Sequence, residues 1–242
     1  MTLPYSPHMP AAAILTIGNE LTSGDIPNTN ASWLARRLER VGVRVAILAA
    51  VPDEIDAVAR FIRREAAEVD IVVVTGGLGG TPDDLTREAV AAAFGVEQET
   101  VPELADDLRA RFRHDPEYAA RWAALPAGST PLDNPLGGAP GFRIENVYVL
   151  PGLPAEMEAM FETIEERIAG APPIDAWRRT YHARESEIVA VLVEANERFP
   201  GVLVGSYPTF GEAGARVEIV LKSSDDRQLA DAAAFVSTAL DT

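Results

Sequence analysis

The stretch TGGLGGTPDDLT, residues 75–86, places four glycines ahead of two aspartates, and both features suggest phosphate chemistry. Glycines at the end of an apolar run let several backbone N–H groups converge on an anion, and the dipole of a following helix adds positive potential. We expect Gly76, Gly77 and Gly79 to hold a phosphate. Thr81 belongs to the same expected ligand-binding set. The stretch matches neither the P-loop nor the dinucleotide fingerprint, so its spacing alone is a weak signal.

The two aspartates, Asp83 and Asp84, admit two interpretations. In the first they cap a helix predicted over residues 81–93, with Thr81 at the N-cap and Asp84 nearly completing a capping box. In the second a divalent cation lies between the carboxylates and a phosphate, because Mg²⁺ commonly takes one or two carboxylates together with substrate phosphates. Four glycines cost about 1 kcal/mol each relative to alanine if they serve only a turn. Close approach by a ligand would explain them, which favours the second interpretation.

A second acidic group supports this hypothesis. Glu20 follows the apolar run 11–17, and Asp53 follows the apolar run 43–51. In a parallel sheet the carboxyl ends of the strands share one edge, where ligands bind, so we expect these residues to meet the glycine loop. Taken singly, Asp53 is equally explained by the dipole of the helix that it precedes, and Glu20 by a solvated loop.

Three further polar side chains near these elements are candidates for ligand contacts. Asn28 and Asn30 suit hydrogen bonds to a base or a ribose, and Asn before a helix is equally common as an N-cap. Arg87 suits either the neutralisation of a phosphate or a surface ion pair. The tryptophans are predicted to be core or interface residues.

The elements that position these side chains alternate between short apolar runs and amphipathic segments. This alternation predicts an α/β fold with a mostly parallel sheet covered by helices on both faces. A Pro/Gly-rich stretch over residues 126–141 is predicted to be an irregular connection or a small β excursion. The expected strands cover residues 11–17, 43–51, 71–74 and 143–150, and the expected helices cover 29–41, 52 onward, 81–93, 102–113 and 154–168.

A second, smaller domain is predicted after a Gly-Ala-Pro-Pro linker at residues 170–173. Its pattern of strand, helix, two strands and helix predicts a small α+β domain. We therefore expect one domain over residues 1–170 and a βαββα domain over 171–242.

The composition limits the classes of partner. The chain has 242 residues and a formal net charge of −16, which argues against nucleic acid or an anionic membrane surface as the main partner. It contains no cysteine, which excludes disulfides, thiolate metal sites and cysteine nucleophiles. No apolar run approaches the ~20 residues that span a bilayer, and no signal-peptide pattern opens the sequence. We expect a cytoplasmic protein.

Five separated blocks resemble, in order, the N-terminal domain of the competence/damage-inducible protein CinA, within the molybdopterin-binding (MoaB/MogA-like) superfamily. They are GNELTSGDIPNTNASWLARRLERVGVRV, VPDE, TGGLGGTPDDLTREAV, ALPAGSTPLDNPLGGAPGF and VYVLPGLPAEMEAMF. The later stretch RESEIVAVLVEANERFPGVLVGSYPTFG resembles the small domain that follows in CinA-like proteins and in the pterin-binding-like half of eukaryotic FAD synthases.

The resemblance implies a three-layer αβα fold, a loop that binds the phosphate of a pterin or nucleotide, and a homo-oligomer, either a dimer or a trimer. Asp53 and Asp84 match two essential aspartates of the molybdopterin adenylyltransferase branch, and Asp83 matches an additional aspartate of CinA-like sequences. On this basis we predict Asp53 and Asp84 as catalytic residues. Asp53, Asp83 and Asp84 are the predicted ligands of Mg²⁺, Mn²⁺ or Co²⁺.

Three functions follow from the resemblance. The leading hypothesis is a metal-dependent pyrophosphatase acting on nucleotide diphosphate linkages of the ADP-ribose or FAD class. The first alternative is a molybdopterin-binding or adenylylating protein, and the second is a non-catalytic nucleotide-binding module.

Overall fold

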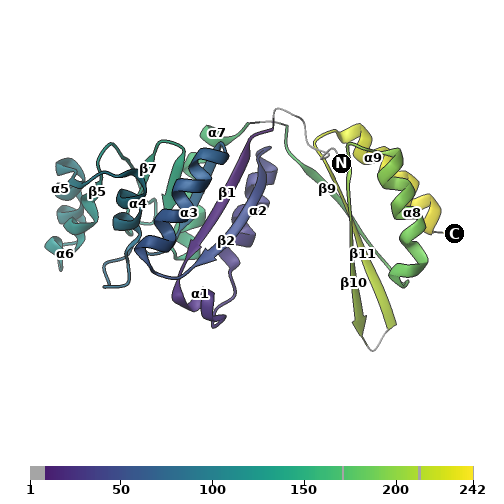
Figure 1. Ribbon diagram of the computed structural model, residues 1–242, viewed down its shortest axis with the longest axis horizontal. Helices are drawn as coiled ribbons and strands as arrows, with labels where there is room; N and C mark the ends of the chain where they lie inside the picture. Colours follow the sequence, from purple (N-terminus) through teal and green to yellow (C-terminus); the bar gives the residue numbers. More distant parts are fainter. Residues whose placement is uncertain (1–8, 171, 212–213, 242) are drawn as a thin grey trace. The chain divides into compact units, whose positions relative to one another are not determined.

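The computed structural model describes residues 9–170, 172–211 and 214–241, and these belong to two units that each have their own sheet (Figure 1). The larger unit contains Pro10–Leu38 and Val43–Ala169. The described part of the smaller unit comes from Met9, Glu39–Gly42 and the chain after Ala169. No helix in the described residues is long and apolar enough to cross a membrane.

The larger unit is built on a six-stranded sheet with the order β2-β1-β3-β8-β7-β6. The first four strands in this order run parallel to one another. Strand β7 forms an antiparallel hairpin with β8, and β6 runs antiparallel to β7. This confirms the predicted mostly parallel sheet. The strands are β1 (Ala11–Ile17), β2 (Arg44–Val51), β3 (Ile71–Thr75), β6 (Thr130–Leu132), β7 (Gly141–Ile144) and β8 (Val147–Leu150).

Helices cover both faces of this sheet, so the predicted three-layer arrangement is present. Leu15 and Val74 of the strands pack against Ile62 of α3 (Ile55–Glu68) on one face, together with α4 (Thr86–Phe94). On the other face α2 (Thr29–Arg40) and α7 (Pro154–Ile168) contact each other through the rings of Trp33 and Phe161, whose centroids are 5.5 Å apart. Figure 1 shows α3 and α2 on opposite sides of β1. The central strands are continuously apolar because both their faces are buried.

A group of short elements extends the larger unit between α4 and β6. Their apolar side chains, among them Leu108, Ala119 and Trp122, form a separate small core. Elements of three to five residues carry too little periodicity to be predicted from sequence, and α1 (Asn19–Ser23) was missed for the same reason. The group contains α5 (Pro102–Arg111), which confirms the helix predicted over residues 102–113. Its shorter elements are β4 (Gln98–Thr100), α6 (Pro116–Ala120), the 3₁₀ turn η1 (Arg121–Ala123) and β5 (Ala124–Pro126).

The smaller unit has the predicted α+β character. Its three strands form an antiparallel sheet of order β10-β11-β9, and Ile219 and Leu221 of β11 pack against Ala195 and Val236 of the two helices. Its elements are β9 (Asp175–Tyr181), α8 (Glu185–Arg198), β10 (Leu203–Gly211), β11 (Gly214–Ser223) and α9 (Asp226–Leu240).

Candidate functional site

The carboxyl ends of four parallel strands lie side by side in the larger unit. Thr16 of β1 pairs with Ala50 of β2 and with Thr75 of β3, and Thr75 pairs in turn with Leu150 of β8. The residues that follow these strands therefore emerge at one edge of the sheet, as expected for an open α/β fold. The backbone N–H of Asn19 donates a 2.8 Å hydrogen bond to Oδ2 of Asp53 and ties the ends of β1 and β2 together.

A cavity of about 470 Å³ opens at this edge, and we call it the carboxylate cavity. Seven of the predicted site residues line it: Glu20, Asp53, Gly76, Gly77, Gly79, Asp83 and Asp84. Its remaining lining residues are Ile17, Gly18, Leu78, Trp122, Gly138, Ala139, Pro151, Gly152, Leu153 and Glu156. Five carboxylates thus face one space, and no basic side chain from the described residues lines it.

Backbone conformation and close contacts within the protein require glycine at two positions of the loop, 76 and 77. Gly76 has φ 109° and Gly77 has φ 63°, a region that L side chains rarely adopt. A Cβ atom at Gly76 would collide with the carbonyl oxygen of Ile17, and one at Gly77 would collide with the hydroxyl of Thr86. Packing within the protein therefore explains these two glycines without a ligand. The argument for a ligand rests on other features of the loop.

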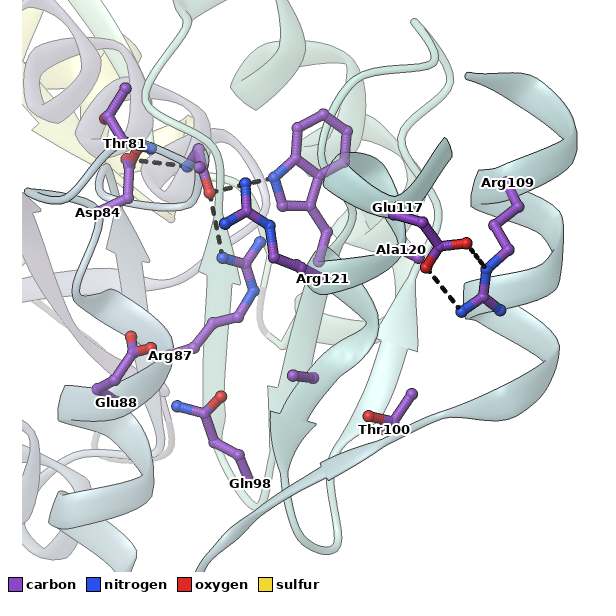
Figure 2. A pocket seen from close by; sticks show the side chains of 14 residues that line it. Thr81, Asp84, Arg87, Glu88, Gln98, Thr100, Arg109, Glu117, Ala120 and Arg121 are labelled. Atoms are coloured by element: carbon purple, nitrogen blue, oxygen red, sulfur yellow. Dashed lines mark hydrogen bonds and ion pairs between the residues drawn. The ribbon is translucent and has the colours of Figure 1, made fainter. Parts of the chain in front are cut away.

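The first interpretation of Asp84, as part of a capping box, does not hold, because α4 begins at Thr86 and not at residue 81. Oδ1 of Asp84 accepts the backbone N–H of Gly79 at 2.9 Å, and Oδ2 accepts the N–H and the hydroxyl of Thr81 at 2.8 and 2.5 Å. Figure 2 shows the side chain of Thr81 next to that of Asp84. The carboxylate therefore closes a turn before the helix, and Thr81 is not an N-cap.

Two amides of the loop are available to a ligand in the carboxylate cavity. The N–H groups of Gly76 and Gly79 already donate, to Leu150 O and to Asp84. By contrast, no acceptor within the described chain takes the N–H of Gly77 or Leu78, and both residues line the carboxylate cavity. Backbone donors without acceptors at the edge of a cavity are the usual receptor for a phosphate oxygen.

The pKa of Asp53 reflects the burial and the negative charge of the cavity. Burial raises the pKa of its carboxyl, the hydrogen bond from Asn19 opposes that rise, and the charges of Glu20, Asp83 and Asp84 add to it. The carboxylates are thus close enough to repel one another. A cation is the natural counterpart of such a group of like charges.

Only some of the three predicted metal ligands are placed to bind a cation. Within the described chain, no set of three or more His, Cys, Asp or Glu side chains is arranged to hold a metal ion. Asp53, Asp83 and Asp84 therefore do not form a ready-made three-ligand site, because Asp84 is engaged by three donors of its own turn. Mg²⁺ needs only one or two carboxylates when a substrate phosphate and water complete its shell. Asp53 and Asp83 fit that role.

The remaining predicted residues lie elsewhere. Thr81 lines a neighbouring cavity, while Asn28 and Asn30 line a smaller one that also contains Gly76 and Gly152. Oδ1 of Asn28 accepts the N–H of Ala31, which supports its interpretation as a helix cap. Asn30 donates to Gly152 O at 2.8 Å, and its buried Oδ1 has no partner among the described residues.

Three residues shape the site through contacts that the sequence did not indicate. The hydroxyl of Thr86 is buried and donates to Gly76 O at 2.8 Å. Nε1 of Trp122 donates to Gly79 O at 3.1 Å. Arg87 is not in a surface ion pair, because it is buried and donates to backbone carbonyls of the loop. Thr86 and Trp122 are ordinary helix and core residues by their pattern, whereas Arg87 was already a candidate for neutralising a phosphate. Only the fold brings all three to the glycines.

Two family models match the chain. Residues 13–170 match the model described as a probable molybdopterin binding domain. Residues 180–242 match the model described as the middle domain of FAD synthase.

Individual relatives agree with these matches. A protein of Archaeoglobus fulgidus is 38% identical, and the alignment covers 82% of this chain and 86% of that protein. A CinA-like protein of Frankia casuarinae is 38% identical over 96% of this chain, which spans 58% of that relative's length. Among solved structures, the protein CinA of Thermoplasma acidophilum, described as having unknown function, superposes with a TM-score of 0.62 and 31% identity. That superposition covers 65% of this chain and 97% of that one.

Proposed function

The chain belongs to the molybdopterin-binding MoaB/MogA-like superfamily as a CinA-like protein, and from this premise we propose that it binds a phosphorylated pterin or nucleotide in the carboxylate cavity. The observation that carries the proposal is the pair of free amides of Gly77 and Leu78 at the edge of that cavity. They receive the phosphate, and the apolar side chains of Leu78, Trp122 and Leu153 offer a surface for a flat ring.

A divalent cation is part of this proposal because the cavity is acidic. A phosphate beside five carboxylates is strongly disfavoured unless positive charge lies between them. Asp53 and Asp83 would hold Mg²⁺, Mn²⁺ or Co²⁺, and Asp84 would keep the glycine loop in the conformation that presents its amides. Glu20 and Glu156 line the same space and add to its negative potential.

Binding is tested by calorimetric titration with AMP, ADP-ribose, FAD and a pterin phosphate, each with and without Mg²⁺. We expect saturable binding that weakens when Mg²⁺ is removed. Asp53→Asn should abolish the Mg²⁺ dependence. Asp56→Asn is the matched control, since Asp56 is exposed in the first turn of α3 and does not line the cavity. Equal affinities with and without Mg²⁺ in the wild type would contradict the role of the cation.

A second candidate function is hydrolysis of a nucleotide diphosphate linkage of the ADP-ribose or FAD class. The acidic group around Asp53 favours it, and so does the similarity of residues 180–242 to the middle domain of FAD synthase. A bound divalent cation would supply charge stabilisation at the phosphoryl group and activation of water. In this function the loop amides orient the phosphate, and Asp53 is the residue on which turnover depends.

Hydrolysis is tested by a screen of metals against substrates, with products detected by mass spectrometry. AMP together with ribose 5-phosphate, or AMP together with FMN, would establish the activity, and Asp53→Asn should remove it. Incubation with molybdopterin and ATP separates adenylylation from hydrolysis. Tight binding without turnover in Mg²⁺, Mn²⁺ and Co²⁺ would overturn the catalytic candidate and leave a nucleotide-binding module.

A further inference from the structure

A second cavity, of about 520 Å³, shares Gly79, Asp84 and Trp122 with the carboxylate cavity but differs from it in charge. We call it the arginine cavity, because Arg87, Arg109 and Arg121 line it, as Figure 2 shows. Its volume lies within the range of about 300–1,000 Å³ that is typical of small-molecule sites. No part of the proposed function uses this space.

Arg87 is a buried cation that lacks a carboxylate partner among the described residues. Arg87 is only 6% exposed. Its guanidinium donates to two neutral acceptors, Leu78 O at 2.8 Å and Gly79 O at 3.4 Å. Its Nε is buried and has no acceptor in the described chain. Burial lowers its pKa to about 10, against the opposing charges of Glu88 and Asp84. Buried charges are normally paired, so an orphaned donor here indicates a missing anion.

Arg121 adds a second uncommitted guanidinium to the same cavity. It lies over the ring of Tyr118 at 4.7 Å and forms no ion pair with a carboxylate of the described chain. Arg109 differs, because it is held by Glu117 at 2.9 Å and by Asp106 at 3.0 Å. The cavity therefore contains one arginine that carboxylates neutralise and two, Arg87 and Arg121, that form no ion pair with a carboxylate of the described chain.

We propose that the arginine cavity binds a phosphate group, either free phosphate or a phosphate monoester, between the guanidinium groups of Arg87 and Arg121. The planar fork of a guanidinium matches phosphate oxygens in two parallel hydrogen bonds. Gln98 and Thr100 of β4 also line the cavity and add an amide and a hydroxyl for the remaining oxygens. Three carboxylates also line the cavity. Asp84 is engaged by the N–H groups of Gly79 and Thr81, and Glu117 is paired with Arg109. The third, Glu88, is exposed and interacts with the charge of Arg87.

This site is independent of the ligand proposed for the carboxylate cavity. It needs no divalent cation, because guanidinium groups contact the phosphate directly. The two sites share the glycine loop, whose Gly79 carbonyl accepts from Arg87. The phosphate is therefore titrated in the absence of any divalent cation, so that failure at one site is distinguishable from failure at the other.

The test is an NMR titration of the full chain, labelled with ¹⁵N, with sodium phosphate at constant ionic strength. We expect saturable shifts of the Nε–H resonances of Arg87 and Arg121. Arg121→Gln should weaken the affinity roughly tenfold or more, the usual effect of removing a hydrogen bond to a charged group. Arg121 is exposed, so this variant is expected to fold. Arg113→Gln is the control, because it removes the same charge from an exposed residue outside both cavities.

A parallel titration with AMP distinguishes the two sources of the phosphate group. Shifts of both arginines with AMP would assign a phosphate monoester, and shifts with inorganic phosphate alone would assign the free ion. Three results would overturn the proposal: shifts that do not saturate, shifts confined to the amides of Gly77 and Leu78, or equal affinities for Arg121→Gln and Arg113→Gln.

Discussion

The backbone N–H of Gly79 donates a 2.9 Å hydrogen bond to Oδ1 of Asp84, and this contact joins the glycine loop to the turn that precedes α4. The same carboxylate accepts two further hydrogen bonds from Thr81. An aspartate that was predicted to be a metal ligand thus fixes the shape of the loop instead.

Asp84→Asn should lower both the stability of the protein and the affinity for a phosphorylated ligand. The amide of Asn replaces one acceptor by a donor that faces the donors of Thr81, so the free energy of unfolding should fall by about 1–3 kcal/mol. Urea unfolding followed by circular dichroism measures this change. Asp83→Asn is the control for charge, because Asp83 lies in the same turn and is exposed. Equal stabilities for the two variants would contradict the structural role of Asp84.

Asp53 should make the stability depend on pH in weakly acidic solution. Its pKa is raised in the folded protein, chiefly by burial, so the folded state binds the proton more tightly than the unfolded state does. This contribution to stability is present at low pH and is lost as the pH rises through the folded pKa.

Unfolding measured between about pH 4 and pH 6 tests this dependence. The difference in stability between Asp53→Asn and the wild type should increase in favour of the variant as the pH rises. Asp56→Asn should follow the wild type throughout, as Asp56 lies outside the cavity. Parallel curves for all three proteins would rule out a raised pKa at Asp53.

Gly76→Ala should destabilise the protein more than Gly128→Ala. Both glycines have a positive φ, 109° and 83°, so both substitutions carry a conformational cost of about 1–2 kcal/mol. Only at Gly76 would the new methyl group also collide with a backbone carbonyl, that of Ile17, which adds about 1–3 kcal/mol. Nothing lies within 4 Å of a Cβ atom at Gly128. Thermal unfolding compares the two variants, and equal losses would show that the loop relaxes around the methyl group.

Thr86→Val should destabilise the glycine loop, whereas Thr86→Ser should not. The buried hydroxyl of Thr86 donates to Gly76 O at 2.8 Å, and valine fills the same volume without a donor. Leaving that carbonyl without its donor costs about 1–3 kcal/mol. Amide hydrogen exchange of Gly76 and Gly79, whose N–H groups donate to Leu150 O and to Asp84, should become faster in the valine variant and stay near the wild-type rate in the serine variant. Unchanged exchange in both would show that the loop is held by its other contacts.

The sequence by itself determined the class of fold and the edge at which the polar residues gather. Continuous apolar runs that alternate with amphipathic helices are buried on both faces, and this pattern admits few arrangements other than a parallel sheet between helices. Because parallel strands end at one edge, Glu20, Asp53 and the glycine loop were predicted to meet there, and all of them line one cavity. The family blocks pointed to a pterin or nucleotide ligand.

Only the tertiary structure decided how each side chain at that edge is used. The sequence around Thr81 and Asp84 has the spacing of a capping box, yet the carboxylate turns back to Gly79 because α4 begins five residues later than expected. Arg87 has the pattern of a surface helix residue, and long-range packing buries it beneath the loop. Local spacing specifies which hydrogen bonds are possible, whereas the competition between distant donors, acceptors and packed side chains determines which of them form.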